Sequence, residues 1–315
     1  MKAYLENIAI LVCGAFFATG CSLQEETAPD RSEMVTVCLN VVPEDADASR
    51  ADSDASDTSP HVDRIICAAY DVLGNLLPEL GDGANEHGQI VQAFDGKSTE
   101  IKLTLVKGQQ YKFVLWAQSS ECKAFDTQDL QEVKVDYSQI PTIDDEAEAF
   151  SKTEVFTAVA NGNRRIVLRR ALAKVNVLVE KEALGKISNT FGEITTSQVT
   201  VSGLPAVFSV VNDDVKPTTG APESEAEFGK SDISIPGEDD NIVLVSTFLL
   251  APNMGTKLPF RLRLGYGEDE EKTITLNEVI VQRNWLTNVV LSADAVDELL
   301  GNNRVLPANK RGINT

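Results

Sequence analysis

Apolar and polar residues alternate with a period of two through much of this sequence, and this pattern limits the fold more than any other feature. The first such stretch, Val35–Val41, is ended by Pro43-Glu44-Asp45. Because successive side chains of a β-strand point to opposite faces, the stretch predicts a half-buried strand over residues 34–42. The apolar residues on its buried face are Val35, Val37, Leu39 and Val41.

Similar stretches, separated by turn residues, follow along the chain. They are Val62–Tyr70, Ile101–Leu105, Tyr111–Trp116, Ile166–Leu168, Ala173–Val179, Ser197–Val201, Ala206–Val211, Ile242–Leu250, Leu258–Leu264, Thr273–Leu276, Val279–Gln282 and Trp285–Leu291. Many short strands with few helical periods indicate an all-β sandwich or barrel. Residues 123–157 have no clean period and leave room for short helices, and residues 212–241 predict a long loop. The strand pattern restarts near residue 161, so we expect β-sandwich domains at residues 34–160 and 161–315.

The composition suits a folded, exported protein rather than one that binds nucleic acid. Of the 315 residues, 43% are hydrophobic, which is enough to fill a core. The net charge is −20, and removal of residues 1–20 leaves it unchanged, because one lysine and one glutamate are lost. Such an acidic surface repels nucleic acid and anionic lipid headgroups, so we expect neither to attract the protein.

An apolar run over residues 8–18 leads into the tetrapeptide Ala18–Cys21 and then into a polar stretch. This order is typical of a secretory signal, and it resembles the lipobox of bacterial lipoproteins. The resemblance implies that residues 1–20 are removed, that Cys21 is acylated, and that residues 21–33 form a tether to the outer membrane. The alternatives are an ordinary signal peptide with an incidental cysteine or a short membrane helix, although a bilayer span needs roughly 20 apolar residues.

The sequence contains no recognisable catalytic or metal-binding motif. His61 and His87 belong to no metal or nucleophile pattern, and phosphate-loop, GxSxG and HExxH motifs are absent. The abundant carboxylates are interpreted as solvated surface. We therefore expect no enzyme activity, no cofactor and no metal. Cys38, Cys67 and Cys122 remain after the signal, without metal-ligand spacing, and we favour no disulfide between them.

Five segments, taken in order, carry a resemblance to a known family. They are Val62–Leu77, Lys107–Ala117, Leu168–Val177, Leu249–Pro252 and Arg283–Val290. Together with the lipobox they resemble the fimbrillin-like lipoproteins of gut and oral anaerobes, which are subunits of type V pili. The resemblance implies two transthyretin-like Greek-key β-sandwiches in tandem and a structural role in a cell-surface fimbrium, with a contribution to adhesion.

The resemblance also implies a route of assembly. The lipidated precursor reaches the cell surface, and an Arg-specific protease then cuts the loop after the first strand. Loss of strand 34–42 opens a groove that a strand from another subunit fills, which is β-strand addition. We expect the cut at Arg50, in the acidic loop Glu44–Ser59, with Arg64 as the second choice because it begins a strand. The expected partners are other pilus subunits and, through the lipid anchor, the outer membrane.

Two questions stay open at this point. The C-terminal tail, Asp297–Thr315, lacks the sustained alternation expected of a donor strand, and Pro307 removes a ladder donor. A shaft, an anchor and a tip subunit are therefore all compatible with the sequence, and no host receptor can be named. The alternative function is a monomeric surface lipoprotein that binds glycans, for which Trp116 and Trp285 are candidate stacking platforms, although core positions suit both better.

Overall fold

The computed structural model describes residues 33–44, 62–78, 84–140, 147–216, 224–231, 241–267, 270–296 and 306–307. The strands are β1 (Met34–Pro43), β2 (Arg64–Tyr70), β3 (Ile90–Ala93), β4 (Thr99–Val106), β5 (Gln110–Gln118), β6 (Phe125–Asp126), β7 (Val133–Val135), β8 (Ala149–Thr157), β9 (Gly162–Arg170), β10 (Leu172–Glu180), β11 (Ile194–Leu204), β12 (Val207–Ser209), β13 (Asp214–Val215), β14 (Ser224–Ser231), β15 (Asn241–Leu250), β16 (Thr256–Tyr266), β17 (Glu270–Val281), β18 (Leu286–Leu291) and β19 (Leu306–Pro307). The labelled helices are the 3₁₀-helix η3 (Tyr137–Gln139) and the α-helix α1 (Lys181–Phe191), and residues 293–296 are also helical. The predicted all-β class with β-sandwich sheets is confirmed.

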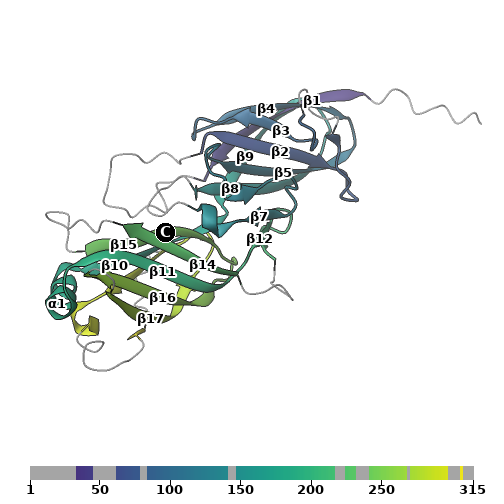
Figure 1. Ribbon diagram of the computed structural model, residues 1–315. Coiled ribbons are helices and arrows are strands. Elements are labelled where there is room, and N and C mark those ends of the chain that lie inside the picture. The colour runs from purple at the N-terminus through teal and green to yellow at the C-terminus, as the bar shows by residue number, and fades with distance from the viewer. Residues whose placement is uncertain are drawn as a thin grey trace, which may run out of the picture. The chain divides into compact units, whose positions relative to one another are not determined.

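In the first sandwich, β1 is the central strand of the layer β9-β1-β4 (Figure 1). It pairs antiparallel with β4 along residues 34–41 and parallel with β9 along residues 37–43. Within the described ranges β4 pairs with no other strand, and β9 pairs elsewhere only with the start of β8. The backbone hydrogen bonds of this layer therefore depend on β1.

The layers β9-β1-β4 and β3-β2-β5-β8 enclose a common apolar core. Leu39 and Val41 of β1 are fully buried in it, together with Phe113 and Leu115 of β5. The outward residues of β1 remain partly exposed. The first strand thus has the alternation that its sequence predicts, with one face in the core and the other toward solvent.

The second sandwich repeats this arrangement. Its layers are β15-β10-β18 and β14-β11-β16-β17-β19, and β10 pairs antiparallel with β15 and parallel with β18. β10 thus occupies the same kind of position as β1. β9 pairs with β1 of the first sandwich, and β10 pairs with β15 of the second. The chain therefore passes from one sandwich to the other at Ala171, between these two strands.

Several elements differ from the sequence prediction. β8 lies in the stretch expected to be irregular. Its sequence lacks a clean alternation because Ser151 and Thr153 are polar residues that hydrogen-bond to other parts of the fold. β14 lies within the predicted loop 212–241 and pairs with β11. β17 joins two predicted strands through a bulge at Glu278, whose φ is 61°. Helix α1 is also missed by the prediction, since it buries merely Ala183, Leu184 and Ile187.

The outer face of β2 and β5 is apolar and packs against other parts of the chain. Trp116 is fully buried there, with its ring centroid 5.4 Å from that of Phe125 and 6.0 Å from that of Phe208. β7 pairs with β12, which carries Phe208. This face of the first sandwich and the core of the second therefore belong to one continuous apolar cluster.

The role of β1 in the core leads to a first prediction. Leu39→Ala is expected to lower the free energy of unfolding by about 2–5 kcal/mol, because it leaves a cavity at a fully buried position. Asn40→Ala, on the outward face of the same strand, should change it by less than about 0.5 kcal/mol. Urea denaturation of both variants checks this, and equal effects would contradict the assigned register of β1.

Candidate functional site

The candidate site is the slot that β1 fills between β4 and β9, hereafter the β1 slot. Its walls are apolar side chains with exposures of 0–1%, namely Ile101, Leu103 and Leu105 of β4 and Ile166 and Leu168 of β9. Without β1, these side chains and the facing backbone groups of two strands would meet water. The slot therefore suits an extended segment with apolar residues at alternate positions, antiparallel to β4 and parallel to β9.

Both ends of β1 are tied to the rest of the fold by hydrogen bonds. At the start, the Thr36 amide donates to the Asn161 side-chain oxygen over 2.7 Å. At the end, the Glu44 amide donates to the Leu168 carbonyl over 2.6 Å. These two bonds hold both ends of β1 in the slot.

The side chain of Glu44 also reaches the second sandwich. Its Oε2 accepts a hydrogen bond from Asn284 Nδ2 at 3.0 Å and lies 3.6 Å from Arg169 Nε. Asn284 lies in the turn between β17 and β18, where its backbone N–H donates a hydrogen bond to the Leu172 carbonyl over 2.9 Å. The end of β1 thus touches a turn that is itself held in place.

The same turn carries a buried arginine. Arg283 is 3% exposed and donates to the Arg170 carbonyl at 2.9 Å and to Ser151 Oγ at 3.1 Å. It also pairs with Asp213 at 2.7 Å. Burial lowers the pKa of the Arg283 guanidinium, while the carboxylate of Asp213 acts in the opposite direction. A buried charge with this set of partners holds the turn in one position.

The structure places some of the residues singled out by the sequence. The side chains on the buried face of β1 are Val35, Val37, Leu39 and Val41, with exposures of 5%, 3%, 0% and 0%. Arg64 is the first residue of β2, where it pairs with positions in both β3 and β5. A protease needs an unpaired extended segment, so this pairing disfavours cleavage at Arg64. Cys21 and Arg50 lie outside the described residues.

Sequence reasoning missed the contacts that define the slot. The parallel partner of β1 is β9, and the partners of Thr36 and Glu44 are Asn161 and Asn284. These residues are far apart along the chain, and no local pattern marks them as neighbours. A parallel pairing of the first and last strands of a sandwich cannot be deduced from the alternation of either strand.

The described cysteines form no disulfide with one another and lie in different surroundings. Cys67 is 1% exposed inside the first sandwich, and burial raises its pKa to about 12. Cys38 lies on the outward face of β1, and its pKa is raised by burial and by nearby Glu100. Cys122 is buried in the other apolar cluster. Cys67 can therefore report on opening of the first sandwich.

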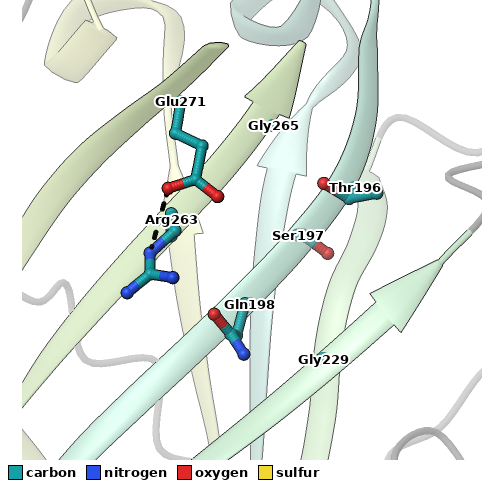
Figure 2. Close-up of a pocket in the computed structure, with 7 residues that line it drawn as sticks. All are labelled: Thr196, Ser197, Gln198, Gly229, Arg263, Gly265 and Glu271. Atoms are coloured by element: carbon teal, nitrogen blue, oxygen red, sulfur yellow. Dashed lines mark ion pairs between the residues drawn. The ribbon is translucent and has the colours of Figure 1, made fainter. Parts of the chain in front are cut away.

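A shallow polar pocket of about 380 Å³ lies on the sheet formed by β11, β14, β16 and β17 (Figure 2). In Figure 2 the side chain of Arg263 points toward Glu271, with Nε 3.5 Å from Oε2. Gln198 donates to Glu227 at 3.2 Å. The lining residues are Thr196, Ser197, Gln198, Gly229, Arg263, Gly265 and Glu271.

The described residues that line this pocket offer hydrogen bonds and charge, and none of them has an aromatic face for stacking on a sugar. A Cβ at Gly265 would clash with Thr196 Oγ1, so the glycine lets the two strands approach closely. Trp116, one of the candidate platforms, is fully buried and donates to Gln118 at 2.8 Å. The core interpretation of Trp116 is therefore confirmed.

The described residues show neither a metal site nor a membrane-spanning helix. They contain no cluster of three or more His, Cys, Asp or Glu side chains that could hold a metal ion. None of the helices in the described ranges has the length and apolar character needed to cross a membrane. His87 pairs at the surface with Glu86, at 3.6 Å.

A protein-family model matches residues 29–291, and its description is a family of unknown function, DUF6562. The chain belongs to this family. The match covers every described strand except β19. No curated protein matches the sequence.

Several solved structures are similar to this DUF6562 chain. The fimbrial anchor protein Mfa2 from Porphyromonas gingivalis is 12% identical, with 82% of this chain and 90% of that chain covered and a TM-score of 0.47. A "putative adhesin" from Bacteroides thetaiotaomicron is 12% identical, with 84% and 94% covered and a TM-score of 0.49. A protein from the same organism, described among "putative polysaccharide binding proteins", is 12% identical, with 82% and 91% covered and a TM-score of 0.47.

The burial of Cys67 gives a prediction for the folded protein. In a chain starting at Ser22 with Cys38→Ser and Cys122→Ala, the remaining thiol should react with a thiol reagent at pH 8 at least about 100-fold more slowly than in urea. Burial raises the pKa of the Cys67 thiol from 9.0, its value in the unfolded chain, to about 12 in the folded protein. The contribution of this thiol to the free energy of unfolding is therefore complete below pH 9 and falls as the pH rises toward 12. Rapid labelling without urea would contradict the assigned burial.

Proposed function

We propose that this protein is a structural subunit of a cell-surface pilus that assembles by strand exchange at the β1 slot. The observation that carries the proposal is the position of β1. It lies at the centre of its layer, yet it is the first strand of the described chain. A single cut in the segment that follows it would separate β1 from every other strand of the sandwich.

Energetics explain why exchange requires a competing strand. Full burial of each of the side chains Val35, Val37, Leu39 and Val41 is worth roughly 1.5–3 kcal/mol, or about 6–12 kcal/mol together as an upper value. A cut strand would therefore stay in place unaided. An incoming strand with the same alternation can replace these contacts and the backbone ladder at once, which makes the exchange close to balanced.

The proposed route to the surface follows from the N-terminal motif. Acylation at Cys21 would anchor the precursor to the outer membrane, and proteolysis at Arg50 would then release the mature subunit from its lipid. The partners are further subunits of the same or a related fold. Adhesion would be a property of the assembled fibre.

A second candidate function is glycan binding by a monomeric surface lipoprotein. The observation in its favour is the polar pocket around Gln198, Arg263 and Glu271. No aromatic side chain occurs among the described residues that line this pocket, which makes glycan binding the weaker candidate.

Digestion of the folded, unlipidated precursor with an Arg-specific protease tests the pilus proposal. We expect one new N-terminus at Ala51 and a ladder of detergent-resistant multimers on an unboiled denaturing gel. Arg50→Lys should remain uncut and monomeric, whereas Arg64→Lys, the matched control, should behave as the wild type.

Cleavage without multimers would identify a subunit that needs a different partner, such as an anchor or a tip. A wild-type precursor that stays uncut and monomeric would contradict the proposal and favour the glycan-binding lipoprotein.

A further inference from the structure

The end of β1 makes a contact that strand pairing does not require. Glu44 follows the last residue of the strand, and its side chain lies 3.0 Å from Asn284 of the second sandwich and 3.6 Å from Arg169 of β9. Its backbone amide is already bonded to the Leu168 carbonyl. The carboxylate therefore adds a second attachment at the same point.

Asn284 has a backbone conformation that favours glycine. Its φ is 59°, in the left-handed region, where an asparagine is tolerated but a glycine fits without strain. The side-chain N–H group of Asn284 donates a hydrogen bond to the Glu44 carboxylate, and a glycine has no side chain that could do this. The neighbouring Arg283 is buried and fixed by Ser151, Arg170 and Asp213. The donor to Glu44 is thus held by a rigid turn of the second sandwich.

We infer that Glu44, Asn284 and Arg169 form a latch that retains the end of β1, with Asn284 as the contribution of the second sandwich. This inference rests on the proposed strand exchange for its biological meaning. The latch lies at the end of β1 that adjoins the segment proposed to be cut. After cleavage, this end would be the first part of β1 free to fray, and displacement by another strand would begin there.

The latch gives Glu44 the role of a positioning residue in strand exchange. It slows the opening of β1 without lining the slot, because its side chain points away from the apolar core. A donor strand with a carboxylate at the matching position would restore the latch after exchange, and a donor without one would be held by the slot alone.

Hydrogen exchange on the uncut precursor tests the latch directly. Glu44→Ala and Asn284→Gly should each raise the exchange rate of the amides in residues 40–44 by about 3- to 10-fold, while β5 and β16 keep their wild-type rates. Asn284→Gly preserves the turn and removes the donor. The double variant should be no faster than Glu44→Ala, because Asn284→Gly removes one of the two contacts that Glu44→Ala removes.

Glu121→Ala is the matched control. It removes an exposed carboxylate from the first sandwich and should leave every rate unchanged. Removal of a latch contact also lowers the free energy of unfolding, so urea unfolding of the latch variants should show a loss no larger than their change in exchange of about 3- to 10-fold corresponds to. Glu121→Ala should match the wild type. Unchanged rates in residues 40–44, or equal acceleration in every strand, would overturn the latch.

A second measurement links the latch to function. A fluorescent peptide with the sequence of residues 34–44 is mixed with precursor cut in the segment after β1, and its uptake is followed over time. We expect uptake about 3- to 10-fold faster into Glu44→Ala than into the wild type. If neither protein takes up the peptide, the proposed strand exchange fails while the hydrogen-exchange result still decides on the latch. If both take it up at the same rate, strand exchange stands and the latch is wrong.

Discussion

The pairing of β1 with both β4 and β9 is the interaction on which the first sandwich depends. β1 supplies the ladder of β4 and most of the ladder of β9, and its inward side chains close the core between the two layers. Remove β1, and two strand edges and an apolar surface become exposed together. Among the described strands β1 comes first along the chain, so after a single cut behind it only pairing and packing would hold β1 to the other strands.

The second sandwich has a similar strand order, but its central strand could not be separated from the other strands by one cut. β10 lies between β15 and β18 just as β1 lies between β4 and β9. However, β10 is joined directly to β9 on one side and to α1 on the other. One cut cannot release it. The asymmetry between two similar sandwiches thus arises from chain connectivity rather than from strand pairing.

Contacts between the two sandwiches combine an apolar cluster with a buried polar network. Trp116 and Phe208 belong to the cluster, and Arg283 forms the centre of the network. Loss of one partner of a buried charge costs more than the pair itself contributes, so these contacts favour a single arrangement. That arrangement is what allows Asn284, on the second sandwich, to meet Glu44 at the end of β1.

The sequence by itself determined the all-β class, the buried face of β1 and most of the later strands, because a period of two in side-chain burial is local information. It could not predict β8, whose Ser151 and Thr153 serve distant partners, or β14, which has too few apolar residues for a period. Only the tertiary structure decided that β1 pairs parallel with β9 and that Glu44 meets Asn284. Those contacts join residues far apart in the chain, and their position depends on how complete layers pack rather than on any local pattern.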